Sequence, residues 1–188
     1  PAVYAEKERY ATQTGRRIVE LVKQNIKPRD ILTREALLNG VILTLAIAGS
    51  TNAVLHLLSF AREVGVELTL DDFDRLSEAV PVISRPAVIG EMKDFLYKDC
   101  LTVSGHTIGE IAAAGKSLDH EVLTTVDEPV FKNGGIVVIR GNLSPNGAIC
   151  RTTTISEKSR KFEGPARVFH SDEEAHAAVV SGKIKKGD

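Results

Sequence analysis

The feature that most constrains the fold is a segment, Arg34 to Ala48, that is apolar on nearly every side. Thr33 precedes it as a helix cap, and Glu35 stands in its first turn, where the helix dipole favours a negative charge. A helix without a polar face is normally buried inside a larger protein. We therefore expect this segment to lie at the centre of a helical core.

Further helices are expected around this segment. Apolar spacing and helix-end signals predict helices at Ala5–Asn25, Ala53–Val64, Asp71–Ala79, Ile89–Tyr97 and from Thr107 to Gly115. Capping boxes are expected where Thr or Ser precedes Asp or Glu by three residues: Thr69 with Asp72, Thr107 with Glu110, and Ser171 with Glu174. The first 120 residues are thus predicted to be mainly helical.

The character of the sequence changes after about residue 117. The β-branched run Ile136–Arg140 is typical of a buried strand, and Asn146-Gly147 predicts a hairpin turn into a second strand, Ala148–Thr153. A third short strand is expected at Ala166–Phe169, before a helix that ends at Val180. The sequence therefore predicts a mixed α/β fold. Residues 1–120 would be the helical part of an α/β domain, and 121–188 the start of a β-rich, barrel-like domain.

Charge and apolar length exclude several classes of partner. The chain has 24 basic and 25 acidic residues, which gives no electrostatic reason to expect nucleic acid or an anionic membrane as a partner. The apolar stretch Gly40–Gly49 is too short to span a bilayer, and no signal segment is recognisable. A cytoplasmic protein is expected. Cys100 and Cys150 lie far apart in sequence, and we interpret them as small apolar core residues.

The best local candidate for a site is Gly49-Ser50-Thr51-Asn52, which interrupts two apolar helices. Hydroxyl groups beside free N–H groups at a helix start suit a carboxylate or phosphate, and glycine allows close backbone approach. These four residues are our candidates for substrate binding. A plain helix break with a Ser or Thr cap explains the same pattern, and the residues leave both interpretations open.

Other polar residues have simpler interpretations. His56 is expected to be a core histidine, and the remaining histidines lie in loops or on the surface. Asp71, Asp72 and Asp74 resemble a carboxylate cluster, but helix capping explains two of them, and we prefer this interpretation to metal binding. The segment Arg140-Gly141-Asn142 is expected to be a structural turn. Three lysines, Lys183, Lys185 and Lys186, are expected to face solvent.

Six stretches, in order along the chain, together resemble one family. They are Asp30–Ala36, Gly49–Leu57, Leu70–Arg75, Asp99–Gly105, Gly134-Gly135 followed by Arg140–Leu143, and Glu163–Phe169. Their order and content are similar to those of the dihydroxy-acid and sugar-acid dehydratases. The chain resembles an interior stretch of such an enzyme, from the end of its N-terminal, cluster-binding domain to the start of its C-terminal domain. The family usually has a longer loop between Ser84 and Ala87.

The resemblance implies a hydro-lyase that converts a 2,3-dihydroxy carboxylic acid to a 2-keto acid, working as a homodimer or higher homo-oligomer. It also implies an iron–sulfur cluster acting on the leaving hydroxyl and a Mg²⁺ ion holding the substrate. In the family, the ligands of both cofactors and the serine base lie outside the stretch shown here. We therefore assign no catalytic and no metal-binding residue within it.

Three hypotheses about function remain from the sequence. The first is a dihydroxy-acid dehydratase of branched-chain amino-acid biosynthesis, which the Gly164–Phe169 stretch favours. The second is a dehydratase of a sugar acid, such as an aldonate or phosphogluconate. The third is a protein of another class, in which these residues form a non-catalytic fragment or a structural subunit.

Overall fold

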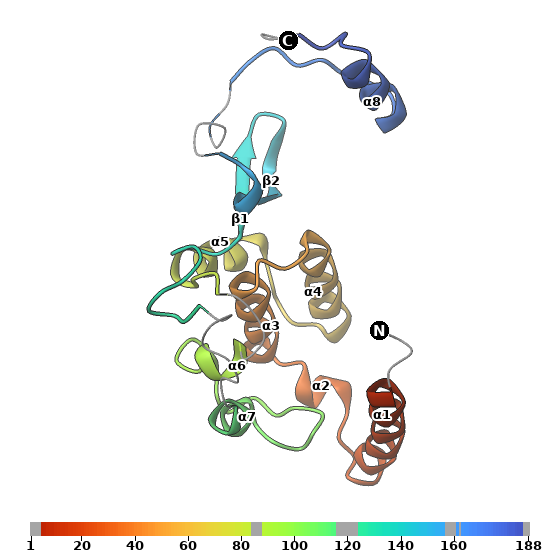
Figure 1. Ribbon diagram of the computed structural model, residues 1–188. Helices are drawn as coiled ribbons and strands as arrows, with labels where there is room; N and C mark the ends of the chain where they lie inside the picture. The colour runs from red at the N-terminus through yellow and green to blue at the C-terminus, as the bar shows by residue number, and fades with distance from the viewer. Residues whose placement is uncertain (1–4, 84–87, 116–123, 157–160, 162, 186–188) are drawn as a thin grey trace. The chain divides into compact units, whose positions relative to one another are not determined.

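The computed structural model describes residues 5–83, 88–115, 124–156, 161 and 163–185 (Figure 1). The chain forms two compact units, Pro1–Thr153 and Thr154–Asp188. Helices and a small antiparallel sheet make up the described structure, which confirms the mixed helix and strand class. None of the helices in the described ranges has the length and apolar character needed to cross a bilayer.

Helix α3 (Arg34–Ala46) forms the centre of the first unit, as its sequence predicts. The Oγ1 atom of Thr33 accepts a hydrogen bond from the Ala36 amide at 3.2 Å, which fixes the start of the helix. The side chain of Asn39 is buried, and it bonds to both the amide and the carbonyl of Tyr97. The apolar side chains of α3 that are buried are Leu37, Leu38, Val41, Ile42, Leu45 and Ala46.

Three helices pack around α3. They are α4 (Thr51–Val64), α5 (Leu70–Ala79) and α6 (Val88–Glu91), and α7 (Ile108–Ala114) packs against α6 (Figure 1). The predicted helix Ile89–Tyr97 was too long, because the chain leaves α6 at Glu91 and continues in turns. Fully buried core side chains outside α3 include Phe73, Val80, Met92 and Ile136.

A β-hairpin completes the core of the first unit. Strands β1 (Ile136–Gly141) and β2 (Ser144–Arg151) pair antiparallel, and β1 packs against α5. Ile136 and Val138 are buried, whereas Ile139 is 47% exposed. The run therefore forms a strand with one covered face, and not the fully buried strand that its composition suggested.

The turn of this hairpin differs from the prediction. The chain reverses at Asn142 and Leu143, and Asn146-Gly147 lies within β2. Between the pairs Ile139–Ala148 and Gly141–Ser144, β1 has one residue and β2 has three, so β2 bulges there. Gly147 has a φ of 102°, a conformation that favours glycine. The glycine is therefore needed for the bulge and not for the hairpin turn.

The chain before α3 forms α1 (Ala5–Lys23) and α2 (Pro28–Ile31). Pro28 begins α2, because a proline at the first helical position loses no hydrogen bond. The apolar face of α1 is largely open to solvent. Ile18, Val19 and Val22 are 56%, 51% and 74% exposed.

The second unit contains helix α8 (Asp172–Val180). Ser171 caps it by accepting a bond from the Glu174 amide, but the Glu174 carboxylate accepts from the His170 amide, so only half of the predicted capping box forms. The predicted strand Ala166–Phe169 is wrong: the described part of the unit has no strand at these residues. Arg167 instead donates to the Lys183 carbonyl at 2.7 Å.

Candidate functional site

The candidate segment Gly49–Asn52 begins where α3 ends. Ala48 adopts a left-handed conformation, with a φ of 46°. Its amide donates to the Leu45 carbonyl at 3.1 Å, and the Gly49 amide donates to the Thr44 carbonyl at 2.8 Å. These two bonds form a Schellman motif, which closes the helix and turns the chain. A Cβ on Gly49 would lie 3.1 Å from the Thr44 carbonyl oxygen, so this tight closure favours glycine.

The next residues begin α4. The Oγ atom of Ser50 accepts a hydrogen bond from the Asn52 amide at 3.2 Å, which makes Ser50 the helix cap. The side chains of Ser50, Thr51 and Asn52 are exposed, and the first turn of α4 contains no acidic residue. The positive end of the helix dipole therefore faces solvent without a negative side chain of its own. The cap interpretation is confirmed, and it is compatible with binding of an anion at the same place.

The β-hairpin brings a second segment, about 100 residues away in sequence, to this junction. The Nη2 atom of Arg151, at the end of β2, donates to the Ala48 carbonyl at 3.1 Å. Gly135 lies so close that a Cβ there would be 2.7 Å from the Cβ of Ala48. The Thr152 amide donates to the Gly135 carbonyl at 3.1 Å and holds the two ends of the hairpin together. We call Gly49–Asn52 with Arg151 the α3–α4 junction.

Sequence reasoning missed Arg151. The sequence analysis treated it only as part of a strand. The feature that could have pointed to a functional role is that it is the sole charged residue of the predicted strand Ala148–Thr153. The structure also explains why two glycines stand at positions 134 and 135. A Cβ on Gly134 would lie 3.0 Å from the Cα of Ser77, so both glycines allow the hairpin to approach the helices closely.

The groups at the α3–α4 junction are of kinds that attract anions. A helix N-terminus and a guanidinium group together favour a carboxylate or phosphate. Hydroxyl, amide and guanidinium side chains neither gain nor lose a proton near neutral pH. The junction can therefore orient an anionic group, but its residues do not form an acid–base pair.

The three aspartates of α5 form ion pairs with arginines. Asp72 is buried and bonds to Arg34 Nη2 at 2.8 Å, to Arg75 Nη2 at 3.3 Å and to the Thr69 amide at 3.0 Å. Burial alone would raise the pKa of Asp72, but the Thr69 amide and the Arg34 charge outweigh it and lower that pKa below its ordinary value. The predicted capping role of Asp72 is confirmed by its bond to Thr69.

Asp71 and Asp74, the other two aspartates of α5, pair with Arg140 of β1. Arg140 contacts the carboxylate of Asp71 and lies 3.5 Å from that of Asp74. Asp74 also accepts a hydrogen bond from the Val138 amide at 3.2 Å. These contacts attach the hairpin to α5. Arg140 thus has a structural role, as expected, but it lies in strand β1, and the turn itself is at Asn142 and Leu143.

The prediction for His56 was wrong. It lies on α4 but is exposed, because α3 covers the opposite side of α4, where Val54 and Ala61 are buried. His106, His170 and His176 are exposed, as expected, and His120 lies outside the described residues. Lys183 and Lys185 face solvent, and Lys186 is likewise outside the described part.

The described residues do not fit the cofactors that the resemblance implies. Within the described ranges, no three His, Cys, Asp or Glu side chains are grouped so that they could hold a metal ion. Cys100 is buried, and burial raises the pKa of its thiol, which disfavours the thiolate that a metal requires. Cys150 is only half-buried, and both thiols are free. Neither cysteine is therefore assigned to a cluster.

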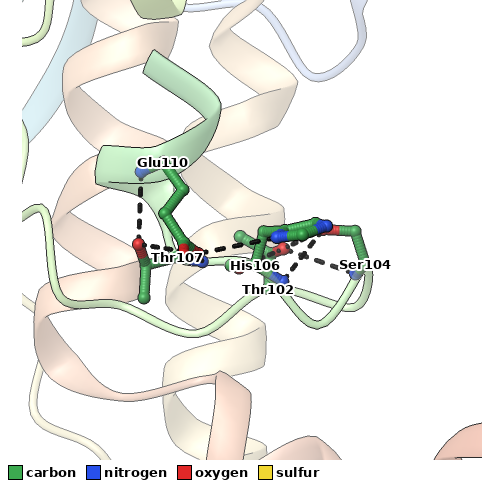
Figure 2. Close-up of polar contacts among 5 residues, drawn as sticks. All are labelled: Thr102, Ser104, His106, Thr107 and Glu110. Carbon is green, nitrogen blue, oxygen red and sulfur yellow. Dashed lines mark hydrogen bonds and ion pairs between the residues drawn. The ribbon is translucent and has the colours of Figure 1, made fainter. Parts of the chain in front are cut away.

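A second polar cluster surrounds the loop before α7 (Figure 2), where the sequence predicted only the capping box of Thr107 and Glu110. The Thr102 and Ser104 hydroxyls lie 2.7 Å apart, and His106 Nδ1 lies 3.6 Å from the Glu110 carboxylate. The Thr107 amide donates to that carboxylate at 2.7 Å and is the main cause of the lowered pKa of Glu110. The cluster caps α7 and closes the loop, so its role is structural.

Comparison with known proteins identifies both parts of the chain. Residues 1–87 match the family model described as dihydroxy-acid/6-phosphogluconate dehydratase N-terminal, and residues 121–188 match its C-terminal counterpart. Residues 88–120 lie between the two matches.

Curated relatives match the whole chain. It is 42% identical to the dihydroxy-acid dehydratase of Pyrococcus furiosus, with 100% of this chain and 38% of that protein covered. It is 40% identical to the enzyme of the same name from Caldanaerobacter subterraneus and 41% identical to that of Methanococcus vannielii, each covered over 37% of its length. The chain thus spans well under half the length of these relatives.

Proposed function

This chain belongs to the dihydroxy-acid/6-phosphogluconate dehydratase family, and we propose that the protein acts as a hydro-lyase on a 2,3-dihydroxy carboxylic acid. The observation that carries the proposal is similarity at about 40% identity across the entire chain to proteins named dihydroxy-acid dehydratase. The product of such a reaction is a 2-keto acid. The relatives' name favours the dihydroxy acid of branched-chain amino-acid biosynthesis over a sugar acid.

We further propose that the α3–α4 junction binds the substrate carboxylate. Gly49, Ser50, Thr51 and Asn52 would present the start of α4, and Arg151 would add a positive charge beside it. Because the helix start and the Arg151 guanidinium would both attract the same carboxylate, they would fix its orientation as well as its position. Hydroxyl loss and proton transfer need groups that the described residues do not supply, so we assign them to polypeptide outside this stretch. The iron–sulfur cluster and Mg²⁺ are proposed there on the resemblance alone.

Several broader features are also proposals. The ranges of the two family models support the division into a helical part, residues 1–120, and a β-rich, barrel-like part that begins at 121. A homodimer or higher oligomer and a cytoplasmic location are proposed on the resemblance alone. A non-catalytic fragment or structural subunit is the alternative of another class.

The activity test is an anaerobic assay of keto-acid formation, with the protein carrying its whole natural polypeptide. The panel contains branched 2,3-dihydroxy acids, aldonates and 6-phosphogluconate. We expect a keto acid from a branched dihydroxy acid, whereas no product from any of them would contradict the proposal. An intact mass near the 20.3 kDa of this stretch alone would support the non-catalytic alternative.

The role of the junction is tested by Arg151→Gln, with Arg140→Gln as the matched control on the same hairpin. A lost charge-assisted hydrogen bond is worth about 1.5–3 kcal/mol, which corresponds to roughly a 10- to 100-fold rise in KM. Arg140 pairs with α5, so its variant should leave KM nearly unchanged. Active enzyme with equal KM values in both variants would refute the junction as the carboxylate site and leave the reaction type intact.

A further inference from the structure

The base of the β-hairpin rests on one small residue of α5, Ser77. Its side chain is polar but buried, with only 2% of the residue exposed. The Ser77 carbonyl accepts a hydrogen bond from the Gly134 amide at 2.7 Å, and the Ser77 hydroxyl donates to the Asp74 carbonyl at 2.9 Å. A Cβ on Gly134 would lie 3.0 Å from the Cα of Ser77 and 3.2 Å from its Cβ. The chain just before β1 is thus in close contact with α5 at this position.

This contact continues through the hairpin to the α3–α4 junction. Thr152 donates to the carbonyls of both glycines that precede β1, at 3.1 Å from its amide and at 3.4 Å from its hydroxyl. Arg151 directly precedes Thr152 and donates to the Ala48 carbonyl at 3.1 Å. The depth at which Gly134 sits on Ser77 therefore determines where the Arg151 guanidinium lies beside the start of α4.

We propose that Ser77 is a positioning residue for the substrate, because its small side chain keeps Arg151 at the proposed carboxylate site. The inference rests on the proposed role of the α3–α4 junction. A larger side chain has no free space, since Ser77 already contacts Gly134 and the Leu45 side chain lies against the same glycine. Added methyl groups would push the base of the hairpin away from α5, and Arg151 would move with it. A displaced guanidinium could no longer meet the carboxylate in the required geometry.

The base and the tip of the hairpin are attached to α5 by different groups. Arg140, nearer the tip, pairs with aspartate side chains, whereas the base is held by the backbone of Ser77. Strand pairing places Arg151 opposite Ile136, at the base. Loss of the Arg140 side chain should therefore leave Arg151 in place, whereas added bulk at position 77 should not.

The test uses the protein with its whole natural polypeptide. Ser77→Val adds bulk at the contact with Gly134, and Ser77→Thr adds less. Ser77→Ala loses the hydroxyl but stays small, so it is the conservative variant. Ala112→Val is the matched control for bulk, because Ala112 is also buried but lies in α7, which packs against α6.

We expect Ser77→Val to raise KM at least about 5-fold while kcat changes less than about 2-fold, as for a loss of binding alone. Ser77→Thr should have a smaller effect, and KM should stay within about 2-fold in Ser77→Ala and Ala112→Val. In the Arg151→Gln protein, Ser77→Val should raise KM less than about 2-fold, because the group that it displaces is already absent. An unchanged KM in Ser77→Val, or an equal rise with and without Arg151, overturns the proposal. If Ser77→Val does not fold, Ser77→Thr replaces it in the same comparison.

Amide hydrogen exchange gives a second readout that needs no turnover. The amides of Gly134 and Thr152 should exchange at least about 10-fold faster in Ser77→Val but not in Ala112→Val, because only the first substitution opens the base of the hairpin. Unchanged exchange overturns the proposal whatever the KM values are. Faster exchange together with an unchanged KM in Arg151→Gln refutes the carboxylate site itself, and with it any role of Ser77 in substrate binding.

Discussion

Replacing Asp72 with alanine should remove a buried connection between α3 and α5. Its carboxylate is only 8% exposed and accepts from Arg34, Arg75 and the Thr69 amide. The cap to Thr69 contributes about 1 kcal/mol, and the bond to Arg34 about 1.5–3 kcal/mol. Arg75 is 58% exposed, so its contact adds no more than about 0.5 kcal/mol. We expect Asp72→Ala to lower the free energy of unfolding by about 3 kcal/mol.

Urea unfolding followed by far-UV circular dichroism measures this loss. With a slope of about 1–3 kcal/mol per molar urea, the midpoint should fall by roughly 1–3 M. The control is Asp71→Ala, because the Asp71 side chain is 80% exposed and its pairing with Arg140 should be worth less than about 1 kcal/mol. If both variants lose the same stability, or if Asp72→Ala loses less than about 1 kcal/mol, the reasoning from burial is wrong.

The same residue gives a pH dependence with a definite sign. Because the pKa of Asp72 is lowered in the folded protein, its contribution is fully present above the ordinary aspartate pKa of about 4. That contribution is lost as the pH falls through the lower folded pKa. The stability difference between the unsubstituted protein and Asp72→Asn should therefore shrink between pH 7 and pH 3. A difference that stays constant over this range would show that the charge of Asp72 is not involved.

Two further predictions concern other parts of the fold. Gly135→Ala places a Cβ 2.7 Å from that of Ala48 and should cost about 1–3 kcal/mol in thermal unfolding, whereas Gly141→Ala, with open space around it, should cost much less. Equal melting temperatures would exclude the close approach. In an NMR titration, Glu110 should titrate below the ordinary glutamate pKa because the Thr107 amide stabilises its charge, and protection of the α7 amides should fall as the pH drops through that pKa. An ordinary or raised pKa for Glu110 would contradict this.

Local signals were sufficient for several helix starts and for the central helix. The caps at Thr33 and Thr107 were predicted because a cap depends on residues only three positions away, and both form as expected. The buried character of α3 also followed from its composition alone. These features need no knowledge of distant segments.

Features that depend on distant partners were missed or misplaced. Ala166–Phe169 has strand-like residues but no strand beside it in the described part of its unit. His56 was placed in the core because nothing in the sequence says which side of α4 faces α3. Arg151 reaches the α3–α4 junction only through the pairing of the hairpin, and the period of its own strand does not reveal it.

The bulge in the hairpin has a consequence for how its length can vary. A one-residue slip between β1 and β2 would move Ile136 and Val138 out of the core and bring Ile139 in. The left-handed Gly147 opposes such a slip, because the bulge can form only where that glycine stands. Insertions at the exposed Leu143 tip should therefore be tolerated, whereas an insertion or deletion between Gly147 and Arg151 would shift Arg151 away from Ala48. The bulge therefore fixes the register of the hairpin and, with it, the position of Arg151 beside the start of α4.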